Sequence, residues 1–291
     1  MNKKSFFTLI IIALLGVILF VSFNKYANKN KKSLNKNLIF LGDTGIGNEK
    51  QKNVANAIKK YCSISRCFEG FILGDVIYDK GVNSINDHQF QEKFERPYKD
   101  LNFPFYIMFG NHDYLGCKEC YLEYSSRLWK MPDYFYKRNV ENVDLFIINT
   151  NDFELKQQQW LENELKQSKK NLKIVLGHHP IITFDEAHSG EFWSGKKELE
   201  EILCRNKVDM YFSGHSHILE YIDSKNTCGF KQIISGGGGA DPRKIKKNNI
   251  DKFYLEKNGF VSLEILENNK FILRFIDDEN LIRYSEEISK H

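Results

Sequence analysis

The chain has 291 residues, of which 42% are hydrophobic and 14% aromatic, so it is long and apolar enough to bury a full core. Its formal net charge of +4 is a local excess, because seven of the 42 basic residues lie within residues 1–37, which hold no acidic residue, and the other 35 face 38 acidic side chains. That balance argues against a nucleic-acid-binding domain, and the lack of a linker rich in Pro, Gly or Ser predicts one domain behind an N-terminal appendage.

The appendage carries an apolar run at residues 6–23 that contains no charged residue. This run approaches the ~20 residues that a helix needs to cross a bilayer. A cleaved secretory signal has a shorter apolar region, about 7–15 residues, and a small-x-small cleavage site, which residues 22–27 match poorly. We therefore expect residues 1–36 to be an uncleaved membrane signal anchor with a basic linker, and residues 37–291 to form an extracytoplasmic domain. The alternative is cleavage, which would give a secreted protein.

The six cysteines are even in number and follow this membrane-targeting segment, which favours disulfides in an oxidising compartment. Two close pairs suggest local disulfides and leave a third, more distant pair, although six cysteines allow 15 pairings. The expected pairs are Cys62/Cys67, Cys117/Cys120 and Cys204/Cys228. A zinc knuckle at residues 117–120 would need a second Cys or His pair nearby, and none is spare.

Apolar runs and helical spacing predict the elements of the main domain. Strands are expected at residues 38–41, 71–73, 105–109, 145–148, 174–176, 210–212, 231–235, 259–266 and 270–276, and helices at 53–61, 87–98, 154–168 and 196–205. The first half therefore follows a βαβαβ order, and the C-terminal part is rich in strands. This order predicts an α/β fold of two packed sheets flanked by helices.

Short glycine-flanked motifs follow most of the predicted strands. They lie at residues 42–45, 74–78, 110–113, 177–180, 187–190 and 214–217. Taken alone, Asp43 or Asp75 would simply cap a helix. His215 and His217 point to metal more directly, because side chains at i and i+2 project from one face of an extended segment. Together the motifs bring carboxylates and imidazoles to strand ends, which predicts a two-metal hydrolase.

Two side chains indicate which metals the centre would hold. Asp75 is placed to bridge two cations about 3.5–4 Å apart. Tyr78 follows three residues later. A phenol has a pKa of about 10 and becomes a ligand only beside a strongly acidic cation, which favours Fe(III) over Mg²⁺ or Ca²⁺.

The motifs resemble those of the purple acid phosphatases, within the calcineurin-like metallophosphoesterase superfamily. Tyr78 stands where the superfamily commonly has a second aspartate, and Gly45 where it commonly has histidine. Segments at 78–87, 90–95, 110–116 and 131–136 are similar to the small tartrate-resistant (type 5) acid phosphatases, and the similarity covers roughly residues 37–280. The resemblance implies a four-layer αββα sandwich of two mixed β-sheets flanked by helices.

The resemblance also implies two metal sites that share one carboxylate. The Fe(III) site would consist of Asp43, Asp75, Tyr78 and His217. The site of the second, divalent metal (Fe, Zn or Mn) would consist of Asp75, Asn111, His178 and His215.

Three further residues receive catalytic roles from the resemblance. His112 would bind phosphate and help to protonate the leaving group, with Asp113 orienting it, and His188 would be a second histidine on the substrate side. Two positions depart from the family pattern, Val76 in place of asparagine and His179 in place of tyrosine, and neither removes a ligand.

The activity implied is hydrolysis of phosphate monoesters, small molecules or phosphoproteins, by attack of a metal-bound hydroxide at a binuclear Fe(III)–M(II) centre. A phosphodiesterase or nucleotide pyrophosphatase of the same fold is the alternative among enzymes. The alternative of another class is a non-catalytic ectodomain that binds iron or phosphate, or a redox centre. All seven implied ligands are present, which favours an enzyme.

Overall fold

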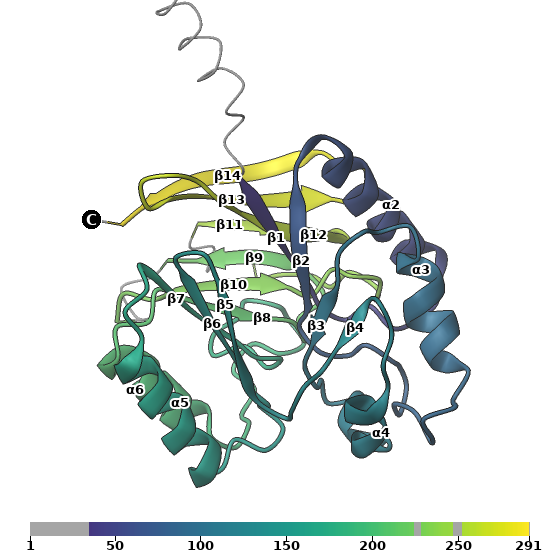
Figure 1. The fold of residues 1–291 in the computed structure, drawn as a ribbon, viewed down its shortest axis with the longest axis horizontal. Helices are drawn as coiled ribbons and strands as arrows, with labels where there is room; N and C mark the ends of the chain where they lie inside the picture. Colours follow the sequence, from purple (N-terminus) through teal and green to yellow (C-terminus); the bar gives the residue numbers. More distant parts are fainter. Residues whose placement is uncertain (1–34, 224–227, 247–251, 291) are drawn as a thin grey trace, which may run out of the picture. The chain divides into compact units, whose positions relative to one another are not determined.

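The structure is a computed structural model that describes residues 35–223, 228–246 and 252–290. In this part of the chain two mixed sheets of seven strands each pack face to face (Figure 1). The first has the strand order β14-β13-β12-β1-β2-β3-β4. Its strands are β1 (Lys36–Leu41), β2 (Cys67–Ile72), β3 (Phe105–Ile107), β4 (Trp129–Lys130), β12 (Gly259–Ile265), β13 (Lys270–Asp277) and β14 (Ile282–Ser289). β1 to β4 run parallel, so their carboxyl ends meet at one edge.

The second sheet has the order β11-β9-β10-β8-β7-β6-β5, with β6, β7, β8 and β10 parallel. Its strands are β5 (Tyr136–Val140), β6 (Val143–Ile147), β7 (Leu172–Leu176), β8 (Met210–Ser213), β9 (Leu219–Ile222), β10 (Lys231–Ser235) and β11 (Phe253–Leu255). The main core lies between the sheets, where Phe40 of β1 stacks on Phe212 of β8 with ring centroids 4.3 Å apart. Burial of apolar side chains on both inner faces holds the two sheets together.

Helices cover the outer face of each sheet (Figure 1). On the first sheet lie α2 (Glu49–Ile64), the π-helix η1 (Phe90–Glu95) with α3 (Arg96–Tyr98), the 3-10 helix η2 (Asp113–Leu115) and α4 (Lys118–Glu123), and on the second lie α5 (Leu155–Gln167) and α6 (Lys196–Arg205). Asn48 caps α2 by accepting from the Gln51 N–H, and the helix buries Val54, Ile58 and Tyr61 at helical spacing. The predicted four-layer αββα sandwich is confirmed.

The predicted elements with strong apolar patterns are confirmed, and short or edge elements were missed. Residues 87–98 do not form one helix: the π-helix η1 runs into α3, where Pro97 cannot donate a backbone hydrogen bond. The edge strand β14 was missed because its sequence, IRYSEEIS, leaves most of its residues exposed or half-buried and has no apolar stripe.

All three expected disulfides are present, at Cys62–Cys67, Cys117–Cys120 and Cys204–Cys228. The predicted signal anchor at residues 6–23 lies outside the described residues. Across the described ranges, no helix combines the length and the apolarity needed to cross a membrane.

Candidate metal centre

The candidate ligands lie in the loops that directly follow β1, β2, β3, β7 and β8. Backbone contacts draw these loops together across the two sheets, since the Asp43 N–H donates to the Gly74 carbonyl (3.0 Å) and the His215 N–H donates to Asp43 Oδ2 (2.8 Å). The packing is close enough to require glycine at position 45, where a Cβ would stand 1.9 Å from the Val76 carbonyl oxygen. Close packing of the loops therefore requires glycine at position 45, where the superfamily commonly has histidine.

One group of candidate ligands gathers around Tyr78. The Tyr78 hydroxyl lies 3.1 Å from Asp43 Oδ1 and 3.3 Å from His217 Nε2, and these two atoms are 3.6 Å apart. Two ligand atoms that bind one cation at about 2.0–2.2 Å lie roughly 3–3.5 Å from each other. The three side chains are thus spaced as ligands of one ion.

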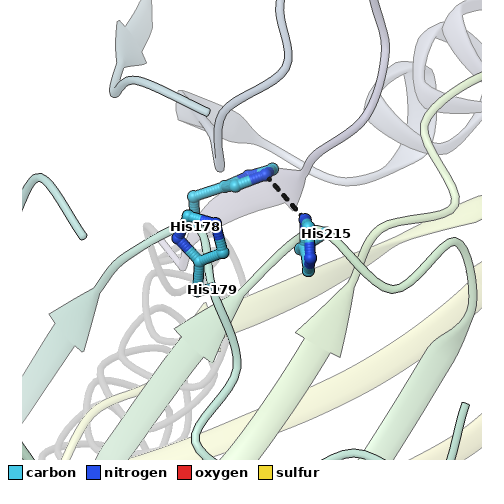
Figure 2. Close-up of side chains that lie close together, drawn as sticks. All are labelled: His178, His179 and His215. Atoms are coloured by element: carbon cyan, nitrogen blue, oxygen red, sulfur yellow. Dashed lines mark hydrogen bonds between the residues drawn. The ribbon is translucent and has the colours of Figure 1, made fainter. Parts of the chain in front are cut away.

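A second group gathers around Asn111. His178 Nε2 and His215 Nδ1 lie 2.9 and 3.0 Å from Asn111 Oδ1 and 3.3 Å from each other. Figure 2 shows these two imidazoles converging, with the His179 ring beside them. The spacing again matches that of ligands around one cation.

Hydrogen bonds on the outer side of each ring decide which nitrogen faces this second group. His178 Nδ1 donates to the Leu73 carbonyl (2.8 Å), and His215 Nε2 donates to Glu191 Oε2 (2.9 Å). The opposite nitrogens of the neutral rings therefore carry lone pairs. Three acceptors, two imidazole nitrogens and the Asn111 oxygen, then point at one another with no proton between them. Such a set fits a cation.

Asp75 lies between the two groups. Its Oδ1 accepts from the His112 N–H (2.9 Å), while its Oδ2 lies 3.6 Å from His178 Nε2 and 3.9 Å from His112 Nε2. Ligand atoms of Asp75, Asp43 from the first group and His178 from the second all lie within 4.8 Å of one another. One oxygen is thus held by the backbone and the other is left to face both groups, as a bridging ligand requires.

Three of the candidate ligands hold strained backbone conformations. Asp43, Asp75 and His215 have φ values of 58°, 53° and 66°, in the left-handed region that only a few per cent of non-glycine residues adopt, Asn, Asp and His more often than the others. Strain of this kind costs about 1–3 kcal/mol per residue and clusters at functional sites. The three strained residues coincide with the turns after β1, β2 and β8 that aim side chains at the centre.

Burial changes the pKa of several candidate ligands, and in each case it favours the uncharged form of the side chain. Burial and the neighbouring Asp75 raise the pKa of Asp43, and burial followed by Asp43 and Asp75 raises the pKa of Tyr78. Burial lowers the pKa of His178 and His215, and with Arg243 it lowers that of His217 to about 4. The imidazoles are therefore neutral, and the charge of Asp75 opposes ionisation of the buried Asp43 beside it, which fits bound cations.

His112 lies at the edge of the centre with one ring nitrogen held from outside. Its Nδ1 donates to the Asp79 carbonyl (2.6 Å), so Nε2 faces Asp75. We expected Asp113 to orient this ring, but in the structure the carboxylate of Asp113 bonds other groups. It accepts from the N–H groups of Val76, Ile77 and Gly110 and from the Tyr121 hydroxyl. Asp113 therefore ties the β2 and β3 loops together, and burial, with Asp75, raises its pKa to about 7.

His188 joins the centre from the loop before α6. Its ring packs against that of His215 at a tilt of 38°, with centroids 4.0 Å apart, and its Nδ1 lies 2.6 Å from Glu191 Oε2. Glu191 was not identifiable from the sequence, because a glutamate three residues after a histidine in a loop forms no recognisable pattern. His188, Glu191 and His215 also lie close enough together to form a possible metal-binding group.

The two departures from the family pattern are both buried. Val76 is part of the core beneath the first sheet. His179 Nδ1 shares a hydrogen bond with the Thr150 hydroxyl (2.8 Å), the ring packs beside Trp193, and burial lowers the pKa of His179 to about 2. The neutral His179 ring forms a wall of the centre beside His215.

The fold and these paired groups of ligands define a class of protein. The sequence model of the calcineurin-like phosphoesterases matches residues 36–219, and the chain belongs to that family. Within the family it is similar to the purple, tartrate-resistant acid phosphatases, as the sequence motifs indicated. It is 31% identical over 233 residues to the rabbit (Oryctolagus cuniculus) tartrate-resistant acid phosphatase type 5, an alignment that covers 66% of this chain and 70% of that protein.

Other relatives agree with this placement. Purple acid phosphatase 3 of Arabidopsis thaliana is 33% identical over 229 residues, which cover 67% of this chain and 61% of that protein. Among solved structures, purple acid phosphatase PPD1 from yellow lupin (Lupinus luteus) superposes with a TM-score of 0.72 at 18% identity, over 89% of this chain and 54% of that one. GAP50, described as the anchor in the inner membrane complex of Plasmodium, superposes with a TM-score of 0.77 at 21% identity, over 88% of this chain and 89% of that one. At these identities the structural matches show the fold alone.

Proposed function

We propose that the protein is an acid phosphatase that hydrolyses phosphate monoesters at a dimetal centre. The observation that carries this proposal is the convergence of lone-pair atoms from Asn111, His178 and His215, next to the Asp43, Tyr78 and His217 group, with Asp75 between them. One metal would be held by Asp43, Asp75, Tyr78 and His217, and the other by Asp75, Asn111, His178 and His215. Bound there, two cations supply Lewis-acid polarisation of the phosphoryl group and neutralise its charge.

The chain's own residues supply the proton transfer and the positioning. His112 Nε2 faces the centre because the Asp79 carbonyl holds Nδ1, so the doubly protonated ring would offer its Nε2 proton to the ester oxygen of the leaving group. His188 offers a second imidazole, packed against the ring of His215. Asp113 holds the loops that carry Asp75 and His112 in register through its five hydrogen bonds.

Steady-state release of phosphate from an aryl phosphate tests the function directly. The purified chain, supplied with iron and zinc, should turn over the monoester and lose activity with a chelator. A bis-aryl phosphate assayed in parallel distinguishes the phosphodiesterase alternative. A chain that binds two metals and releases no phosphate would leave a binding or anchoring role, the kind of role that GAP50's description gives to that protein.

Tyr78 leads us to propose Fe(III) as one of the two metals. Its hydroxyl lies within 3.3 Å of both Asp43 and His217, so a phenolate at this position would share their metal. We expect the oxidised protein to show a visible phenolate-to-iron charge-transfer band that Tyr78→Phe abolishes. Absorbance spectra recorded with metal analysis check this, and a colourless wild type that contains two metals per chain would refute it.

We also propose that the chain acts outside the cytoplasm, tethered by residues 6–23. Three disulfides among the described residues support an oxidising compartment, because thiols stay reduced in most cytosols. The full-length protein should sediment with membranes and migrate faster on a non-reducing gel than on a reducing one. A soluble product that begins near Asn28 would overturn the tether, and six free thiols in native protein would overturn the export.

A further inference from the structure

One carboxylate oxygen lies between two histidines of the centre. Glu191 Oε2 is 2.6 Å from His188 Nδ1 and 2.9 Å from His215 Nε2. A carboxylate oxygen accepts hydrogen bonds, so both ring nitrogens donate to it. The side chain of Glu191 is 40% exposed, whereas those of His188 and His215 are 16% and 9% exposed. Glu191 thus reaches inward from the protein surface to two buried rings.

The partner of His215 differs from the partners of the other two candidate histidine ligands. His178 Nδ1 and His217 Nδ1 donate to the neutral backbone carbonyls of Leu73 (2.8 Å) and Asp241 (3.1 Å). His215 donates to a carboxylate. A carboxylate on the outer nitrogen of a metal-binding histidine fixes its tautomer and makes the inner nitrogen a stronger ligand, and its loss typically costs about 10- to 100-fold in metal affinity or activity.

The same oxygen determines which nitrogen His188 offers to a substrate. With Nδ1 engaged by Glu191, the free nitrogen is Nε2, which is buried and has no hydrogen-bond partner among the described residues. A buried polar atom without a partner costs free energy that a hydrogen bond to a bound molecule recovers. His188 is therefore set up to form a hydrogen bond with a bound substrate through Nε2, as the acceptor from a protonated phosphate oxygen when the ring is neutral and as the donor when the ring is protonated.

We propose that Glu191 is a positioning residue that couples the divalent metal site to the substrate-side histidine. It holds His215 with Nδ1 toward the metal and His188 with Nε2 toward the phosphate ester, so metal occupancy and substrate contact depend on one side chain. This inference rests on the proposed phosphatase function. It adds a residue that neither the motifs nor the implied ligand sets contain.

Metal binding by the metal-free protein provides the first test, because it does not depend on turnover. Titration with Zn²⁺ in a calorimeter should show two sites in the wild type. Glu191→Ala should weaken one of them by about 10- to 100-fold and leave the other unchanged. Glu191→Gln should fall in between, since its amide oxygen still accepts from the histidines but carries no charge. Glu186→Gln, an exposed glutamate in the same loop, is the matched control and should bind as the wild type does.

The second test separates positioning from a loop-stabilising role. At saturating Zn²⁺, Glu191→Ala should lower kcat about 10-fold or more, and the same substitution should have a much smaller effect in a His188→Ala background, because residues that act as a unit are not additive. Unchanged zinc affinity with only a lower melting temperature, or equal effects of Glu191→Ala in both backgrounds, would overturn the coupling. A wild type that binds no metal would overturn the proposed function itself.

Discussion

Replacing Asp75 by asparagine is expected to lower phosphatase activity by about 10³-fold or more, because two cations lose the carboxylate that both groups of ligands face. Asparagine has the shape of aspartate, and its Oδ1 still accepts from the His112 N–H, so the β2 and β3 loops stay in place. The change therefore removes charge and little else. Metal analysis alongside the phosphate-release assay should show that the variant retains less than the two metals of the wild type.

Thermal stability gives a second test of Asp75→Asn, because the substitution should stabilise the metal-free protein although it lowers activity. Asp43 has a pKa raised by burial and by Asp75, so the metal-free fold is most stable where Asp43 is protonated and loses stability as the pH rises through that raised pKa. Asp75→Asn removes the like charge. The metal-free variant should therefore melt above the metal-free wild type at neutral pH, by a margin that shrinks as the pH falls, and the order should reverse when metal is added.

A surface carboxylate serves as the control for Asp75→Asn. Asp100 is exposed, and its ion pair is with Lys59 of α2 (2.7 Å) and not with a residue of the centre. Asp100→Asn should leave metal content and activity unchanged. If Asp75→Asn keeps both metals and full activity, Asp75 is not the shared ligand and the arrangement of two sites around it is wrong.

Replacing His112 by alanine is expected to lower kcat by about 10²–10⁴-fold, the usual effect of removing a positioned proton donor. The ring is held by the Asp79 carbonyl, while the hydrogen bond to Asp75 comes from the backbone N–H, which alanine keeps. Both metals and the visible band should therefore survive. The loss should be larger for alkyl than for aryl phosphates, because a phenolate leaves with less need of a proton.

His88→Ala is the matched control for this change. His88 is a histidine with a side chain 77% exposed, and its contacts are to Asp87 and Glu92, outside the centre. Its removal should leave kcat unchanged for both substrate types. Loss of metal from His112→Ala, or equal slowing of alkyl and aryl phosphates, would remove His112 from the role of general acid and assign it to His188 or water.

The sequence by itself determined which residue types meet, because strands that run parallel place their carboxyl ends at one edge and the motifs follow those strands directly. The motifs that contain Asp43, Asp75, His178 and the His215/His217 pair were identifiable for this reason, and the resemblance to the purple acid phosphatases supplied Asn111 and the division into two ligand sets. The disulfides were predictable because two of the three pairs are close in sequence, which left Cys204 and Cys228 for each other.

Only the tertiary structure determined the orientation of those side chains. The choice between Nδ1 and Nε2 depends on the outer partners Leu73, Asp241 and Glu191, which lie 24 to 105 residues away from the rings they contact. Asp113 follows His112 in the chain, yet its carboxylate bonds the β2 loop, because backbone N–H groups buried there need an acceptor. Hydrogen bonds between distant segments leave no periodic pattern in the sequence. The sequence therefore predicted the candidate ligand residues but could not predict the orientation of each histidine ring.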